Sequence, residues 1–450
     1  MPGLIGRDGF AEVAEAALDL PGVDGVEVLF MHEWGGLTRF ASSQMHQSTA
    51  REDTGLRVRV VSRGRVGVAA ANDFSPEGAR RAAQSAKEMA EVVGPDPLWP
   101  GLAPMAHVVQ RPERFDEATA TASPAERAED VAALIGTAPA GFTAAGANET
   151  TAVEVGIANT EGQVCWAPST QASLTTVITG GDGGNGFAET FAGRVSEVDA
   201  EAIGRRAAAK AVHSQRPMAL DPGTFEVVLE PAAVSTLVGF LAFMGFGGRM
   251  LAEGRSCFSG KEGTMVAAPT ISIADDADDP ATLGLPFDFE GVARKRVELV
   301  RDGVFLDGVY DLRTAKQVGK ETTGHALPAP NPEGPLPLNL FMETGDATVE
   351  EMIAATHRGL LVTRFHYSNI VNLVESSITG MTRDGTFLIE DGHIVGPVRN
   401  FRFTQSIIDA LSAVSMVGRT AELASEFFFS ASRVPALKID AFQFTSASDH

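Results

Sequence analysis

A long uncharged stretch, rich in apolar side chains, is the feature of the chain that most constrains its fold. Residues 231–248 contain no charged side chain and directly follow a short apolar run, 225–229, in a chain of 450 residues. The run reads as a strand, and residues 232–250 read as a helix. Because the stretch contains Ser235, Thr236 and several glycines, it falls short of a membrane span. We therefore expect a strand that leads into a helix buried in a protein core.

The composition is that of an ordinary globular protein. Hydrophobic residues make up 44% of the chain and charged residues 21%, and a chain of this length is expected to form two or three domains. The formal net charge of −22, with no cluster of Lys and Arg to offset it, opposes binding to nucleic acid. We expect neither a nucleic-acid partner nor a membrane association.

Cysteine usage and the first residues indicate the compartment. Cys165 and Cys257 are the only cysteines and do not form a disulfide framework, which favours a reducing environment. The first residues lead into an amphipathic helix and show no basic region followed by an apolar one. We expect a cytoplasmic protein.

The order of strand and helix signals predicts an α+β fold in two domains. Residues 1–217 are expected to form an α+β domain with an antiparallel sheet, with a connector at about 94–122. Two helix starts in this half share the Ser-Pro pattern of a capping serine followed by proline, at residues 75–76 and 123–124. Residues 218–450 are expected to form a mostly antiparallel β domain that contains the buried helix. Asp-Gly turns at 302–303 and 391–392 predict hairpins in this second half.

A series of short segments carries a resemblance to a known family. They are GRSCFSGKEG at 254–263, PFDFEGV at 286–292, YDLRTA at 310–315, TTGHA at 322–326, GLLVTRF at 359–365, GMTRDGTFLIEDG at 380–392, and LTRFA at 37–41 followed by MHQ at 45–47. In order and spacing the chain resembles the TldD/PmbA family, the "modulator of gyrase" proteins, and specifically its PmbA (TldE) branch. No single segment is diagnostic, but the series extends along nearly the whole chain.

The resemblance implies where a metal would bind in related proteins. TldD-type subunits resemble zinc peptidases, with H-E-x-x-x-H on a C-domain helix and a later Cys as third ligand. Alignment on that motif places Glu230 and Ser235 of this chain near the two His positions. The segment 415–418 resembles the one that leads to the Cys, yet residues 426–432 contain no Cys. We therefore expect no metal ligands and no cofactor in this chain, and zinc in a TldD-like partner subunit.

Four residues form a candidate substrate-binding set, and no residue is assigned a catalytic role. Arg364 and His366 alternate with aromatic residues, so they would share one strand face and contact a substrate carboxylate or amide. The alternative is a hydrogen-bonded strand face in a domain interface. His325 and Glu230 complete the set.

An acidic run at 275–279 could suggest calcium. It lacks the glycine of the sharp turn and the glutamate at the twelfth loop position of an EF-hand, so we expect a solvated acidic loop.

The resemblance and the missing ligands together predict a function. We expect a non-metal-binding PmbA/TldE-like subunit that pairs with a TldD-like zinc subunit in a peptidase acting on peptides or amide-containing natural-product intermediates, including toxin or antibiotic precursors. Two alternatives stay open: a stand-alone hydrolase with a rearranged site around Glu230, His325, Arg364 and His366, or a module that binds peptides without cleaving them.

Overall fold

The N-terminal half is built on one long antiparallel sheet. The computed structural model describes residues 3–279, 284–425 and 431–448. Within them, one sheet has the strand order β3-β2-β1-β4-β5-β6. Its strands are β1 (Gly25–Ala41), β2 (Gln44–Ser62), β3 (Arg65–Ala71), β4 (Thr143–Asn159), β5 (Val164–Thr179) and β6 (Asn185–Ala192).

Helices cover one face of this sheet. They are α1 (Gly6–Leu18), α2 (Pro76–Val92), α3 (Glu117–Ala120), α4 (Pro124–Gly136) and α5 (Ala200–His213), with short 3-10 turns η1 (Pro112–Arg114) and η2 (Val195–Glu197). Helices α1 and α2 pack on β1 to β3 around Val28 and Phe30, and α4 and α5 pack farther along the sheet around Phe40. Because side chains alternate along a strand, Leu29 points to the opposite face, where it meets Phe287 from the C-terminal half.

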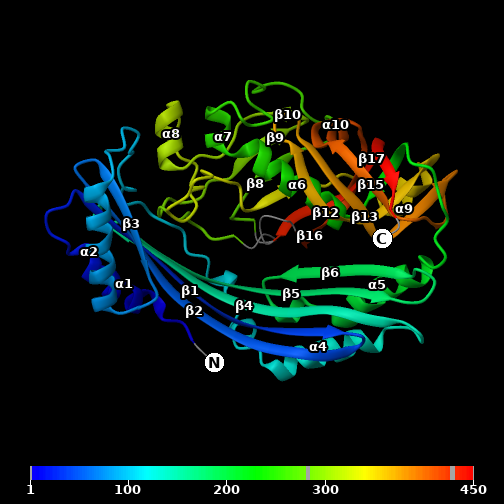
Figure 1. The fold of residues 1–450 in the computed structure, drawn as a ribbon, viewed down its shortest axis with the longest axis horizontal. Coiled ribbons are helices and arrows are strands. Elements are labelled where there is room, and N and C mark those ends of the chain that lie inside the picture. The colour runs from blue at the N-terminus through cyan, green and yellow to red at the C-terminus, as the bar shows by residue number, and fades with distance from the viewer. Residues whose placement is uncertain (1–2, 280–283, 426–430, 449–450) are drawn as a thin grey trace.

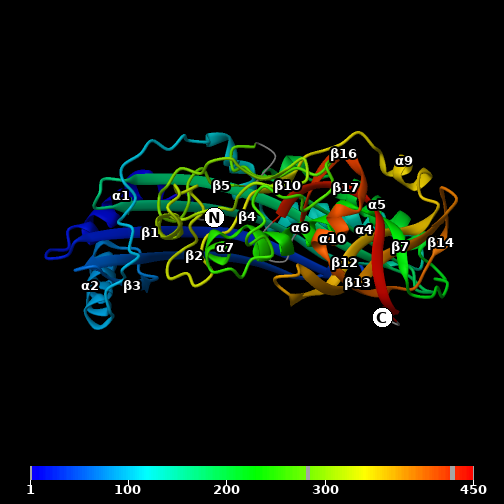
Figure 2. The ribbon, with the colours of Figure 1, turned by 90° about the horizontal axis from the view of Figure 1, so that it is seen from above.

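The C-terminal half lies over that opposite face (Figures 1 and 2). Its strands are β7 (Thr224–Leu229), β8 (Ile273–Asp275), β9 (Val297–Arg301), β10 (Val304–Phe305), β11 (Leu340–Met342), β12 (Arg358–Asn372), β13 (Ser377–Glu390), β14 (His393–Pro397), β15 (Phe401–Ser406), β16 (Val414–Ser425) and β17 (Ala431–Ala447). Its helices are α6 (Pro231–Leu241), α7 (Gly248–Ala252), α8 (Leu312–Val318), α9 (Val349–Ala354) and α10 (Ile407–Ser412). Strand β7 pairs with both β12 and β17, so the pairings β7-β12-β13-β15-β17-β7 close a ring of five strands.

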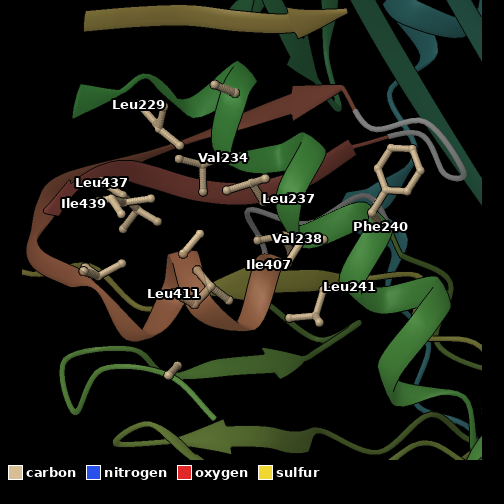
Figure 3. Packing of buried hydrophobic residues seen from close by; sticks show 14 of the residues in the cluster. Leu229, Val234, Leu237, Val238, Phe240, Leu241, Ile407, Leu411, Leu437 and Ile439 are labelled. Carbon is tan, nitrogen blue, oxygen red and sulfur yellow. The ribbon is translucent and has the colours of Figure 1, made fainter. Parts of the chain in front are cut away.

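The predicted strand and buried helix at residues 225–250 lie at the centre of this half. Strand β7 leads directly into α6, whose apolar residues pack among β16, β17 and α10 (Figure 3). The helix was expected to continue to residue 250, but it changes to a π-helical turn, η3 (Ala242–Phe246), and restarts as α7. A side chain at Gly245 would collide with Phe258, whose nearest ring atom lies 2.7 Å from the position of a Cβ, so glycine allows this close packing.

The fold class predicted from sequence is confirmed, and so are several local signals. Ser75 accepts a hydrogen bond from the N–H of Gly78 at 3.0 Å, and Ser123 forms a capping box with Glu126. At the predicted hairpin between β9 and β10, Asp302 and Gly303 both have positive φ, as a type I′ turn requires.

The prediction of a solvated acidic loop at 275–279 is wrong for Asp275 and Asp276, whereas Asp278 is exposed. Asp275 is fully buried at the end of β8, and Asp276 binds Arg296 at 3.1 Å. Asp278 binds Arg111 from the N-terminal half at 2.8 Å. The run therefore holds two parts of the chain together, which its acidic composition could not reveal.

No helix in the described part of the chain is long and apolar enough to cross a membrane.

The central helix yields a stability prediction. Leu237 is fully buried in the main core, so Leu237→Ala should lower the free energy of unfolding by about 2–5 kcal/mol. Val92, at the end of α2, is 85% exposed, and Val92→Ala should change the free energy of unfolding by less than about 0.5 kcal/mol. Urea denaturation of both variants checks the difference, and equal losses would contradict the placement of α6.

Candidate functional site

The junction between β7 and α6 faces a cleft between the two halves of the molecule. The cleft has a volume of about 140 Å³. From the N-terminal half it is lined by Phe187, Glu189 and Lys210, and from the C-terminal half by Glu230, Thr363 and Glu422. Strand β7 ends at Leu229, and proline at the first position of α6 fixes the turn at which the chain enters the helix. This turn brings Glu230 to the cleft.

Glu230 forms an ion pair across the cleft. Its carboxylate accepts a hydrogen bond from the ammonium group of Lys210, on α5 of the N-terminal half. Both side chains are less than one-fifth exposed, at 17% and 19%. The backbone N–H of Glu230 donates to the carbonyl of Val362 in β12 at 3.1 Å, which fixes the residue at the helix start. Both the side chain and the backbone of Glu230 therefore have partners within the chain.

Ser235, one turn into α6, also has partners within the chain. Its hydroxyl donates to the carbonyl oxygen of Ser425, the last described residue of β16, at 2.6 Å. Ser425 in turn donates from its N–H and its hydroxyl to the Glu189 carboxylate, at 3.1 and 2.8 Å. Burial raises the pKa of Glu189, although these hydrogen bonds act against the shift. Ser235 is thus linked through β16 to the sheet of the N-terminal half.

The side chains at this junction do not fit a zinc ion. Tetrahedral zinc in proteins is held by thiolate, imidazole or carboxylate ligands. The family resemblance described above implies that Glu230 and Ser235 lie near the two expected His positions. The Glu230 carboxylate is paired with an ammonium group, and the Ser235 hydroxyl is a poor ligand that already donates to a carbonyl. Across the described ranges, no three His, Cys, Asp or Glu side chains gather in a way that could hold a metal. The segment 426–430, part of the stretch predicted to lack a ligand Cys, lies outside the described residues.

Arg364 is held between the two halves. Its Nε donates to Oδ2 of Asp384 at 2.8 Å, and its Nη2 contacts the same oxygen. Its guanidinium also lies over the ring of Phe187, 4.1 Å from the ring centroid. The carboxylate is 5% exposed and the arginine 22%. This geometry matches the alternative of a hydrogen-bonded strand face in a domain interface, while a role in binding substrate stays a prediction.

His366 follows on the same strand and is half-buried. Its ring lies 4.5 Å from the ring of Tyr367, which is 73% exposed. Burial lowers the pKa of His366, and the positive charges of Arg364 and Arg383 lower it further. The imidazole therefore stays neutral to a lower pH than an ordinary histidine.

His325 lies inside the C-terminal half. It has no exposed surface, and its Nε2 is 2.9 Å from Oδ1 of Asp275 while its Nδ1 is 2.9 Å from the hydroxyl of Thr323. Although burial raises the pKa of Asp275, the contact with His325 holds that pKa below its usual value. The pair connects β8 to the loop 322–326.

The structure brings two of the four predicted residues into one region. Phe187 lines the cleft beside Glu230, and Arg364 lies over its ring. His325 contacts none of the cleft residues named above. Sequence analysis did not identify Lys210, Glu189 or Phe187, because each lies in an ordinary helix or strand of the N-terminal half. Nothing in their local sequence marks them as facing α6.

Comparison with known proteins defines the family. Profiles described as PmbA/TldA metallopeptidase domain 1, central domain and C-terminal domain match residues 26–90, 113–215 and 222–446, and the last of these spans half of the chain. The chain belongs to the PmbA/TldD family. The resemblance expected from the sequence segments is thereby confirmed.

Individual relatives of the PmbA/TldD family match to different extents. Metalloprotease PmbA of Escherichia coli O157:H7 is 24% identical over 444 residues, which cover 95% of each chain. A metalloprotease of Methanothermobacter thermautotrophicus is 24% identical over 221 residues, which cover 49% of this chain and 48% of the relative. This match thus spans about half of the relative's length. The crystal structure of TldE from Thermococcus kodakarensis covers 94% of this chain and 97% of its own, with a TM-score of 0.87 and 22% identity, and so shares the fold.

The pair across the cleft can be tested by a double-mutant cycle. Lys210→Met or Glu230→Gln alone leaves a partly buried group without its partner and should cost about 1–3 kcal/mol of unfolding free energy. The double variant should lose less than the sum of the two. Arg205 and Glu201 form an exposed pair on the same helix, and removing either should cost less than about 0.5 kcal/mol. Additive losses at Lys210 and Glu230 would show that the pair does not couple the two halves.

Arg364 yields a second test. Arg364→Ala strips a nearly buried carboxylate of its main partner and should lower the free energy of unfolding by about 3–5 kcal/mol. Adding Asp384→Asn should recover part of that loss, because the uncompensated charge is removed. If Arg364→Ala leaves the melting temperature unchanged but impairs use of a substrate by the assembled enzyme, the predicted substrate contact is supported instead.

Proposed function

We propose that this chain is the non-metal-binding subunit, of PmbA/TldE type, of a heteromeric zinc peptidase whose metal lies in a TldD-like partner. The observation that carries the proposal is the state of the β7–α6 junction. Near the positions where a related subunit is expected to bind zinc, Glu230 pairs with Lys210 of the other half, and Ser235 donates to Ser425, which in turn binds Glu189. Metalloprotease PmbA of Escherichia coli O157:H7 matches this chain in sequence over 95% of its length, at 24% identity, which supports the assignment to this type.

The contribution of such a subunit is structural and positional. Its own residues supply a rigid platform beside the partner's zinc and, at the cleft, a surface with paired charges. Zinc in the partner would supply a polarised water for amide cleavage. The substrates we propose are peptides or amide-containing natural-product intermediates, and the compartment is the cytoplasm.

Metal analysis and co-expression test this proposal. The purified chain should contain well under one zinc per molecule and cleave no peptide. Co-purification with its TldD-like partner should give a stable complex with peptidase activity, zinc assigned to the partner, and an interface of roughly 2,000 Å² or more as in obligate complexes. Because the Glu230 carboxylate is paired with Lys210 and is not expected to hold the metal, a Glu230→Gln complex should keep the same zinc content as the parent complex.

Two results would overturn the proposal. One is stoichiometric zinc in the isolated chain, lost on chelation together with activity. The other is a partner that is fully active without this chain. Either result would favour the stand-alone hydrolase or the peptide-binding module instead.

A further inference from the structure

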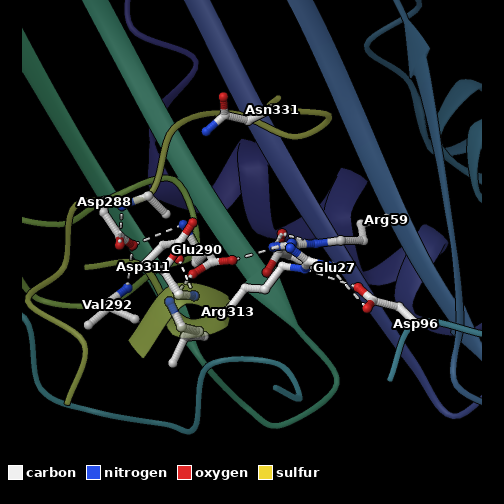
Figure 4. Close-up of polar contacts among 12 residues, drawn as sticks. Glu27, Arg59, Asp96, Asp288, Glu290, Val292, Asp311, Arg313 and Asn331 are labelled. Carbon is white, nitrogen blue, oxygen red and sulfur yellow. Dashed lines mark hydrogen bonds and ion pairs between the residues drawn. The ribbon is translucent and has the colours of Figure 1, made fainter. Parts of the chain in front are cut away.

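A second buried polar cluster joins the two halves away from the cleft (Figure 4). Glu27 of β1 and Arg59 of β2 belong to the sheet, and Glu290 belongs to the turn 286–292 of the C-terminal half. Glu27 is 3% exposed and Glu290 is 7% exposed. Arg59, between them, has a side chain that is 11% exposed.

The contacts of this cluster are unbalanced in charge. Arg59 donates from Nε and Nη2 to Oε1 of Glu27, at 3.0 and 2.5 Å, and from Nη1 to Oε1 of Glu290 at 3.4 Å. Oε2 of Glu290 accepts the N–H of Leu312 at 3.1 Å, at the start of α8. Oε2 of Glu27 is buried and has no hydrogen-bond partner. One guanidinium therefore serves two buried carboxyl groups, and one oxygen is left without a donor.

The acidic groups around the cluster add to this imbalance. Asp288 accepts the N–H groups of Glu290, Val292 and Ala326, each at 2.9 Å, and its charge acts on Glu290 at close range. Asp311, which caps α8, acts on Glu290 in the same direction.

The other cations near the cluster do not neutralise the charge of the second carboxyl group. Arg294 acts on Asp288 and Asp275, and Arg313 binds Asp96 at 3.1 Å. The ring of Trp99 lies 5.3 Å from the Arg59 guanidinium and shields it from water. Arg59 is therefore the cation that faces both glutamates.

We propose that Glu27, Arg59 and Glu290 form a proton-binding site that fastens the turn 286–292 and α8 to the sheet. One proton bound by either carboxyl group leaves one negative charge to balance the guanidinium, and on Glu27 the buried Oε2, which accepts no hydrogen bond, is the oxygen free to carry it. Its release leaves two buried carboxylates around one guanidinium, and their repulsion acts directly across the interface. The inference concerns this chain alone and does not depend on the proposed function.

The electrostatic environment supports this assignment. Burial raises the pKa of Glu27 to about 7, against the attraction of Arg59. Burial likewise raises the pKa of Glu290 to about 7, and Asp288 and Asp311 act in the same direction. In the unfolded chain each would titrate near its ordinary value of 4.5.

The sign of the pH effect follows by linkage. A carboxyl group whose pKa is higher in the folded state binds its proton more tightly there than in the unfolded state. The stabilisation that this proton gives the folded state is fully present below the unfolded pKa. It is lost as pH rises from about 4.5 through about 7. The contact between the turn 286–292 and the sheet should therefore be most stable near pH 5 and least stable above pH 7.5.

Glu27→Gln tests the site because glutamine imitates the protonated side chain. Between pH 5 and pH 8, the melting temperature of the wild-type chain should fall more steeply than that of the variant. The two should agree near pH 5, and the variant should melt higher at pH 8. Glu149→Gln is the matched control: this glutamate lies on the same sheet, pairs with exposed Arg51 and is 36% exposed, so its pH dependence should equal the wild type.

Hydrogen exchange of the intact chain measures local opening of the interface. Exchange rates are first corrected for the intrinsic rates of the amide groups. The equilibrium constant for opening of peptides that cover 286–292 and 312–318 should then rise between pH 5 and pH 7. The rise should be up to about tenfold per pH unit for each proton released. It should then level off. In Glu27→Gln this rise should be reduced, while peptides from α4 should show no difference between the variants.

Three results would overturn the proposed proton-binding site. If Glu27→Gln is less stable than the wild type at pH 8, Glu27 serves as an ionised partner of Arg59 and the site holds no proton. An unchanged pH dependence of exchange in both Glu27→Gln and Glu290→Gln would likewise overturn the proposal. If Glu27→Gln fails to fold at pH 8, that failure also contradicts it, since the neutral side chain is predicted to stabilise the interface there.

Discussion

Burial of both faces of the six-stranded sheet along β1 is the constraint on which the rest of the structure depends. Along β1, Val28 and Phe30 pack against α1 and α2, whereas Leu29 packs against Phe287 of the C-terminal half. The same alternation puts Glu27 on the side of the C-terminal half. A sheet that is apolar on both faces cannot keep one face in water without a large loss of hydrophobic stabilisation. The two halves therefore depend on each other for stability, and polar groups between them must find their partners across the interface.

The sequence predicted the structural features that depend on residues close together in the chain. Ser75 and Ser123 start helices because a capping hydroxyl acts within three residues, and Asp-Gly turns form because two adjacent residues adopt positive φ. The buried strand and helix at 225–250 followed from the absence of charge. The π-helical turn at 242–246 did not, although it contains Gly245, which packs closely against Phe258 from a later segment.

The candidate site was less predictable, because its contacts join distant segments. Arg364 was recognised as a polar residue on a strand face, but its partner Asp384 depends on the register of β12 and β13, which shifts at residues 362–364. Lys210 meets Glu230 only because α5 lies beside the edge of the sheet nearest α6. His325 was grouped with these residues from its place in the sequence, yet its partner is Asp275 within β8. Sequence separation carries no information about which of these histidines and arginines meet.

Two of the charged contacts that join the halves differ in their balance of charge. At the cleft, Lys210 and Glu230 supply one cation and one anion, both with some access to water. In the second cluster, Arg59 faces two carboxyl groups that are almost fully buried. A balanced pair responds little to pH near neutrality, whereas the unbalanced cluster must take up or release a proton there. On our proposal, proton release therefore weakens the Arg59 contact while the Lys210 contact persists. The turn 286–292 and α8 should then loosen while the β7–α6 junction keeps its place against the sheet.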